Sequence, residues 1–225
     1  MNFFHCTTTK SARILLKPKN KKKVKPSYFN FVDCLNDWLR RLLNGNDDDI
    51  PSEDFSFPRY YYSQGDNKLV FWLGSGLYCF AESAKEESPA YAKKSNLDVI
   101  LTINYKDDFT EFKMHQNKEM LQDFLSEVAL PYYRQYYSDD LLTAFELLIE
   151  LLVLEIETEY FTNPHSAAII LEMYLFITNT DYDIVSNKFL KDENNFKYDN
   201  YSSIRNLDSI INFEYNTGLS HEIRA

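Results

Sequence analysis

Three short stretches of the chain hold residue types that can bind a ligand or take part in catalysis. They surround His5 near the start, Tyr78, Ser88 and Tyr91 in the middle, and Glu222 near the end. Histidine titrates near neutral pH, tyrosine joins a flat ring to a polar tip, and a carboxylate can stabilise developing positive charge. These stretches are therefore the first candidates for a functional site.

The middle stretch reads Gly76-Leu77-Tyr78-Cys79-Phe80-Ala81 and continues, after six residues, with Ser88-Pro89-Ala90-Tyr91-Ala92. It resembles the second motif of the poly(ADP-ribose) polymerase branch of the ADP-ribosyltransferases. The resemblance implies that Tyr78 and Tyr91 stack the nicotinamide ring of NAD, that Ser88 binds its carboxamide, and that Gly76 belongs to the same pocket. Two aromatic rings can hold a flat ring that departs as neutral nicotinamide.

The first stretch reads Phe3-Phe4-His5-Cys6-Thr7-Thr8 and is followed by Ala12 and Ile14-Leu15. It is similar to the first motif of the same family, a histidine at the end of a strand that is usually followed by Gly and Ser or Thr. The resemblance implies that His5 holds a ribose hydroxyl of NAD and that Cys6 and Thr7 border the cofactor. Cys6 stands where the family has glycine, so we expect a tighter pocket.

The last stretch, Leu219-Ser220-His221-Glu222-Ile223, follows the small, turn-forming Asn216-Thr217-Gly218. It resembles the third motif of the family, a glutamate that opens a late strand. The resemblance implies that Glu222 is the catalytic carboxylate, which polarises the ribose 2′-hydroxyl and supports the positive charge that forms as nicotinamide leaves. Glu214 is the alternative glutamate.

Taken together, the resemblance implies an NAD-dependent ADP-ribosyltransferase with His5, Tyr78 and Glu222 as its catalytic residues. NAD would be the co-substrate, and nicotinamide would be released as ADP-ribose passes to a macromolecular acceptor, either protein or nucleic acid. By analogy, the chain would be a bacterial or phage toxin, defence or effector enzyme, with a regulatory or neutralising protein as a further partner.

The distribution of charge leaves a second function open. The net charge is −10, yet residues 1–25 carry eight cationic side chains and no acid, so the other 200 residues carry −18. An acidic surface suits a basic partner. The alternative is therefore a non-enzymatic interaction protein of the immunity or antitoxin type. The Lys-rich segment 17–25 could contact phosphates or form a solvated loop.

Other chemistries find little support in the sequence. Gly74-Ser75-Gly76 lacks the third glycine and the lysine of the common nucleotide-phosphate loops. The three cysteines, Cys6, Cys34 and Cys79, and the four histidines lack zinc-site spacing, so we expect neither a metal site nor a disulfide framework. A Cys–His hydrolase is disfavoured because His5 and Cys6 are adjacent on a strand and point to opposite faces.

The sequence shows neither the pattern of a secretory signal peptide nor a run of about 18 apolar residues. We therefore expect the protein to act without a membrane, in the cytoplasm of the producing cell or of a target cell.

Hydrophobic periodicity outlines the elements that must position these residues. We expect strands at 2–6, 69–73, 77–81 and 98–105, and helices at 11–16, 29–43, 83–94, 119–130, 140–160 and 164–178. Residues 181–210 have a mixed pattern with Asn- and Asp-rich loops. The prediction is one α+β domain over residues 1–225, with an ADP-ribosyltransferase-like split β-sheet core and a helical insertion at about 115–180.

Overall fold

A computed structural model describes residues 1–17, 24, 30–44, 62–64, 67–69, 73–158, 164–192 and 197–224. The chain divides into two compact units. Unit 1 comprises residues 1–27, 75–113 and 182–225, and unit 2 comprises residues 28–74 and 114–181. Most of the Lys-rich segment 17–25 and residues 70–72 of the predicted strand 69–73 lie outside the described residues.

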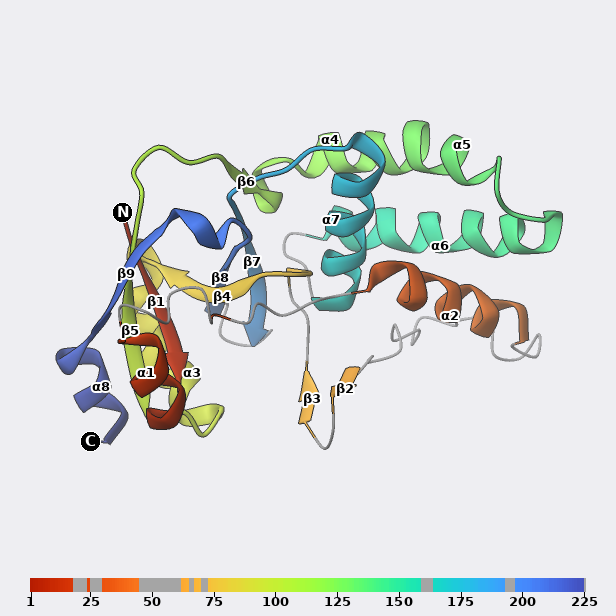
Figure 1. Ribbon diagram of the computed structural model, residues 1–225. Helices are drawn as coiled ribbons and strands as arrows, with labels where there is room; N and C mark the ends of the chain where they lie inside the picture. The colour runs from red at the N-terminus through yellow and green to blue at the C-terminus, as the bar shows by residue number, and fades with distance from the viewer. Residues whose placement is uncertain are drawn as a thin grey trace. The chain divides into compact units, whose positions relative to one another are not determined.

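Unit 1 is built around a seven-stranded mixed sheet with the strand order β6-β7-β8-β4-β1-β5-β9 (Figure 1). Its strands are β1 (Asn2–Thr7), β4 (Leu77–Ala81), β5 (Val99–Tyr105), β6 (Glu111–Lys113), β7 (Ile184–Asp192), β8 (Lys197–Ile204) and β9 (Ile210–Tyr215). The pair β6–β7 is parallel and the other neighbours are antiparallel. The mixed sheet and its helices agree with the predicted α+β class.

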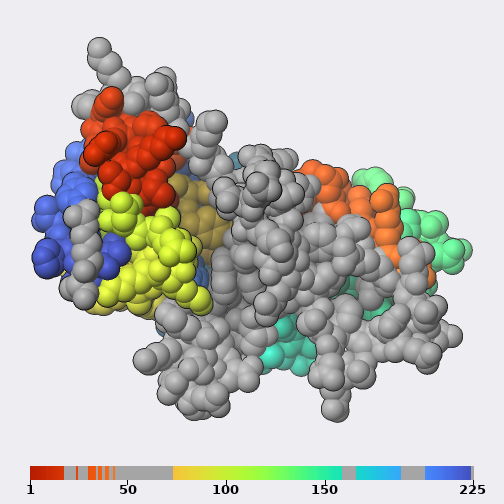
Figure 2. Space-filling model, turned by 90° about the horizontal axis from the view of Figure 1, so that it is seen from below, coloured from red at the N-terminus to blue at the C-terminus, as the bar shows by residue number. Residues whose placement is uncertain are grey.

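The helical segments of unit 1 are short. They are α1 (Thr9–Leu15), η3 (Glu82–Glu87), α3 (Ser88–Lys94), η6 (Leu207–Ser209) and α8 (Thr217–Arg224). Thr8 caps α1, since its side chain accepts a hydrogen bond from the Ser11 N–H. Figure 2 shows the red N-terminal residues, the yellow-green residues of α3 and β5, and the blue C-terminal residues next to one another on one face.

Strand β4 changes its partner in the middle of its length. Leu77–Cys79 pair with β8, whereas Phe80 and Ala81 pair with Phe4 and Phe3 of β1. Strand β1 pairs with β5 along its whole length, from Asn2 to Thr7. The two halves of the sheet therefore meet at β4.

The two faces of the sheet differ in what they bury. One face carries the apolar core of the unit, in which Phe3, Leu101 and Ile103 pack with Cys79 and with Ala12 of α1. Leu101 and Ile103 have no exposed surface, and each such side chain contributes about 1.5–3 kcal/mol to folding. Alternation along the strands directs Phe4, Cys6 and Phe80 to the other face.

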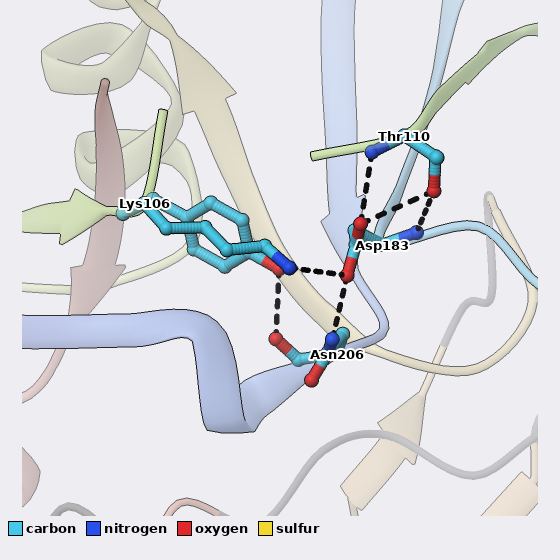
Figure 3. Close-up of polar contacts among 5 residues, drawn as sticks. Lys106, Thr110, Asp183 and Asn206 are labelled. Atoms are coloured by element: carbon cyan, nitrogen blue, oxygen red, sulfur yellow. Dashed lines mark hydrogen bonds and ion pairs between the residues drawn. The ribbon is translucent and has the colours of Figure 1, made fainter. Parts of the chain in front are cut away.

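A network of hydrogen bonds joins the loops at the ends of several strands of the sheet (Figure 3). The Asp183 carboxylate accepts hydrogen bonds from the Thr110 N–H at 2.8 Å and from the Asn206 side-chain amide at 2.6 Å, and Lys106 lies 3.4 Å away. The Tyr105 hydroxyl donates to the Asn206 carbonyl at 2.9 Å. Burial alone would raise the pKa of Asp183, but these hydrogen bonds and the Lys106 charge hold it below its ordinary value.

Unit 2 is mostly helical. Its helices are α2 (Phe31–Asn44), α4 (Lys118–Asp123), α5 (Leu130–Tyr133), α6 (Asp139–Glu157) and α7 (Pro164–Thr178), with a π-helical segment η5 (Phe124–Ala129) and a short turn η4 (Met114–Gln116). A two-stranded sheet of β2 (Tyr62–Gln64) and β3 (Asn67–Leu69) completes it. Helix α2 packs on α6 and α7 (Figure 1), and Leu35 and Leu39 of α2 are buried.

The predicted helices at 29–43, 119–130, 140–160 and 164–178 are confirmed, with small shifts at their ends. The strands at 2–6, 77–81 and 98–105 are confirmed as well. Residues 181–210 differ from the expected loops, because β7 and β8 pair with each other over most of their length. Backbone pairing with a neighbouring strand overrides the weak strand propensity of Asn and Asp. In the described part of the chain, the helices are too short or too polar to cross a membrane.

Candidate functional site

His5 lies near the end of β1 and makes a specific backbone contact with the second motif. Its Nδ1 is 2.8 Å from the carbonyl oxygen of Tyr78, 73 positions later in the chain. A carbonyl only accepts, so Nδ1 carries the proton and Nε2 of the neutral ring is an acceptor. Burial lowers the pKa of His5, and the bond to Tyr78 opposes that shift in part.

Tyr78 lies on β4 opposite Ser203 of β8 and is half-buried. Because Phe4 pairs with Phe80, alternation directs the Tyr78 and Phe80 side chains to the same face as Cys6 and Phe4. The same alternation places the His5 side chain on the core face, opposite Leu101. The His5 ring contacts the backbone carbonyl of Tyr78, while the Tyr78 ring belongs to the opposite face.

Cys6 joins the first motif to the helix of the second motif. Its thiol donates to the Ser88 carbonyl oxygen at 3.4 Å, and burial raises its pKa to about 12. A thiol with that pKa stays protonated near pH 7, so it is a weak nucleophile. Thr7 is buried, and its carbonyl accepts from the Asp98 N–H at 3.3 Å.

Ser88 opens α3 and has no exposed surface. Its hydroxyl donates to the Lys85 carbonyl oxygen at 2.5 Å, which leaves only its lone pairs for a ligand. Tyr91, one turn later, is half-buried and packs edge-on against Phe80 and Tyr201, with ring centroids 5.5 and 5.8 Å away. Phe80 and Tyr201 are 5.4 Å apart, so the three rings form one aromatic cluster.

Gly76 is required by the packing of β4 against β8. Its φ is +137°, and a Cβ at this position would lie 2.0 Å from the Ser203 Oγ and 2.9 Å from the Ile204 carbonyl oxygen. This close approach explains the glycine through the sheet itself.

Glu222 does not open a strand, so this part of the prediction is wrong. Residues Thr217–Arg224 form helix α8. The Asn216 side-chain oxygen accepts from the Leu219 N–H at 3.0 Å, and the Asn216 carbonyl accepts from the Ser220 N–H at 3.1 Å. The lead-in expected to precede a strand is instead a helix N-cap.

Glu222 is exposed on α8 and lines an open cavity of about 390 Å³ in unit 1. This volume is within the range of small-molecule sites. Its walls come from β1, η3, β5 and the start of α8, and its lining residues are Asn2, Phe4, Glu82, Lys85, Glu86, Thr102, Asn216, Gly218, Leu219 and Glu222. The lining has three carboxylates and one lysine, so its net charge is negative. The lysine, Lys85, forms an ion pair with Glu82 at 2.7 Å.

His5 and Cys6 both contact the second motif, but they do so from opposite faces of the sheet. His5 lies on the core face opposite Leu101, whereas Cys6 lies on the face that bears Tyr78 and Phe80. Glu222 lies over the same face of the sheet, since Phe4 of its cavity pairs with Phe80 of the aromatic cluster. Among the described residues, however, the lining of that cavity excludes His5, Tyr78, Ser88 and Tyr91. The alternative, Glu214, is exposed on β9 opposite Thr102 and accepts from the Asn104 amide at 2.8 Å.

Tyr201 on β8 and Asn187 on β7 lie opposite each other and were not among the predicted site residues. The adjacent β-branched residues Ile184 and Val185 are the signal that could have marked β7 as a strand. Within the part of the chain described, no three His, Cys, Asp or Glu side chains are grouped so that they could hold a metal ion.

Comparison with known proteins returned no family model, no curated protein and no solved structure that matches this chain.

Proposed function

We propose that the chain is an NAD-dependent ADP-ribosyltransferase and that unit 1 carries its NAD site. The observation that supports this most is the convergence of two stretches far apart in the sequence. Cys6 donates to the carbonyl of Ser88, 82 positions later, and His5 contacts the carbonyl of Tyr78. The resemblance assigns these residues to one cofactor site, and the two contacts join the first stretch to the second from opposite faces of the sheet.

The partner change of β4 supports the same proposal. Only Phe3 and Phe4 of β1 pair with β4. At the next residue, the His5 side chain contacts the Tyr78 carbonyl of β4. A sheet whose halves meet at one strand agrees with the split sheet that the resemblance implies. The proposed fold is therefore ADP-ribosyltransferase-like in unit 1.

The proposed reaction breaks the bond between the nicotinamide nitrogen and C1′ of the ribose. The electron pair leaves with neutral nicotinamide, the acceptor forms the new bond at C1′, and its proton is released. His5 lies on the opposite face of the sheet from the Tyr78 ring, so it would act as a positioning residue that holds the backbone of Tyr78 through its Nδ1 hydrogen bond. Tyr78 and Tyr91, both half-buried, would supply ring faces for nicotinamide.

The carboxylate that faces the developing positive charge is assigned to Glu222, because it lines the cavity on the face that bears Tyr78 and Tyr91. The alternative carboxylate is that of Glu214 on β9.

Release of nicotinamide from NAD by the parent and by Glu222→Gln and Glu214→Gln tests the assignment. A charge-stabilising group of this kind is worth about 10²–10³-fold in rate. We expect Glu222→Gln to lose that factor and Glu214→Gln to keep the parent rate. A loss confined to Glu214→Gln would move the role to β9, and no turnover by the parent with any acceptor mixture would count against the enzyme.

The net negative cavity favours the second candidate, a binder of a basic partner. The lining of Glu82, Glu86 and Glu222 matches a cationic side chain. Under this candidate, Tyr78→Ala leaves partner binding intact and NAD has no effect on the protein.

A further inference from the structure

Asn187 on β7 carries a buried amide whose hydrogen-bonding capacity is unused. It is 1% exposed, and neither its Oδ1 nor its Nδ2 has a hydrogen-bond partner in the part of the chain that the structure describes. Burying such a group without partners destabilises the folded protein. Most buried amides in proteins are paired, so this one calls for a partner that the described residues do not supply.

The position of Asn187 connects it to the proposed NAD site. It lies directly opposite Tyr201 of β8, and directly opposed residues point to the same face with Cβ atoms about 4.5–5.5 Å apart. Tyr201 in turn contacts Phe80 and Tyr91. The unpaired amide therefore lies beside the aromatic cluster, on the face to which Tyr78 also points.

Resting on the proposed function, we propose that Asn187 is a specificity-determining residue that recognises the carboxamide of nicotinamide. The two amides are complementary, because each offers one N–H donor and one carbonyl acceptor to the other. The ring that bears the carboxamide would lie alongside Tyr91, whose own ring is partly exposed. On binding, the Tyr91 ring would give up part of its contacts with Phe80 and Tyr201 and would contact the ligand ring instead.

This role differs from the one that the sequence assigned to Ser88. The hydroxyl of Ser88 already donates to the Lys85 carbonyl, whereas neither polar atom of Asn187 bonds to another of the described residues. A site built to pair with an amide rejects an analogue that lacks the donor. Nicotinic acid keeps the ring but replaces the amide with a carboxylate. The carboxylate can accept a hydrogen bond from Nδ2, but it has no donor for Oδ1 and its charge is repelled by that oxygen.

The test measures the dissociation constants of nicotinamide and nicotinic acid for the parent and for Asn187→Leu, together with the urea unfolding of both proteins. Leucine has nearly the shape of asparagine and removes the unpaired amide. We expect the parent to prefer nicotinamide at least 10-fold, and Asn187→Leu to bind nicotinamide about 10- to 100-fold more weakly. The variant should be as stable as the parent or more so, because a buried unsatisfied amide is replaced by an apolar group.

Asn212→Leu, at an exposed position on β9, is the matched control and should keep the parent affinity. Equal affinity of Asn187→Leu and the parent for nicotinamide would overturn the inference and leave the NAD site standing. A parent that binds NAD but does not distinguish nicotinamide from nicotinic acid would also overturn it, even if Asn187→Leu failed to fold. A parent that binds neither NAD nor nicotinamide would remove the proposed function and this inference together.

Discussion

At the scale of single residues, the hydrogen bond of His5 determines what the imidazole can do. The Tyr78 carbonyl fixes the proton on Nδ1, and burial lowers the pKa, so the ring is neutral near pH 7 with Nε2 as an acceptor. A ligand hydroxyl can donate to that nitrogen. The same shift also makes the stability of the protein depend on pH.

His5→Asn should flatten part of the dependence of unfolding free energy on pH. In the parent, the unfolded chain binds a proton on His5 at its ordinary pKa of about 6.5, above the lowered pKa of the folded state. Stability from this group is therefore present above pH 6.5 and is lost as pH falls to the folded pKa. Asn keeps a donor for Tyr78 but does not titrate. Urea unfolding between pH 7.5 and 5.5 measures the difference, and parallel curves for the two proteins would contradict the buried neutral histidine.

Two glycines should respond in opposite directions to alanine. Gly76→Ala places a Cβ 2.0 Å from Ser203 at a φ of +137°, so we expect a loss of at least about 1–3 kcal/mol. Gly218→Ala meets nothing nearer than 3.8 Å in helix α8, so it should gain about 0.4–1 kcal/mol. Chemical denaturation gives both values. A tolerated Gly76→Ala would mean that β4 does not approach β8 as closely as described.

At the scale of elements, α8 shows that a short polar segment can be mistaken for a turn before a strand when it caps a helix. Asn216-Thr217-Gly218 fits a turn before a strand as well as it fits an N-cap, and only the contacts decide between them. The Asn216 side chain bonds both Leu219 within the helix and Thr102 of β5. The Ser220 hydroxyl bonds the Ile100 N–H at 2.9 Å, which docks the helix on β5.

Ser220→Ala tests this docking. It removes the acceptor of the buried Ile100 N–H, and a buried donor left without a partner costs about 1–3 kcal/mol. His221→Ala, on the exposed side of the same helix, should stay within about 0.5 kcal/mol of the parent. Equal unfolding free energies for the two variants would show that α8 does not rest on β5.

The elements that were predictable are those with strong local patterns. The apolar, β-branched run of β5 and the helical spacing of Leu35 and Leu39 identify their elements without tertiary information. β7 and β8 lack such a run, because Asn187, Ser202 and Ser203 take buried positions in the sheet. Their identity as strands comes from pairing, and so Tyr201 and Asn187 could not be placed near Tyr91 from the sequence.

At the scale of the whole molecule, each unit is discontinuous in sequence. The helical block expected at about 115–180 belongs to unit 2, which also holds residues 28–74. His5, Tyr78, Ser88, Tyr91, Asn187 and Glu222 all belong to unit 1. The proposed NAD chemistry is thus assigned to one unit, and unit 2 is a candidate for recognition of the acceptor.

Thermal unfolding with and without millimolar NAD tests whether unit 1 binds NAD at Tyr78. It should be measured for the parent, for Tyr78→Ala, and for Tyr215→Ala as a matched tyrosine on the exposed side of β9. At a concentration 100 times the dissociation constant, NAD adds about 2.7 kcal/mol of stability. We expect a rise in the unfolding temperature of the parent and of Tyr215→Ala that is lost in Tyr78→Ala. No rise in the parent, or an equal rise in Tyr78→Ala, would contradict it.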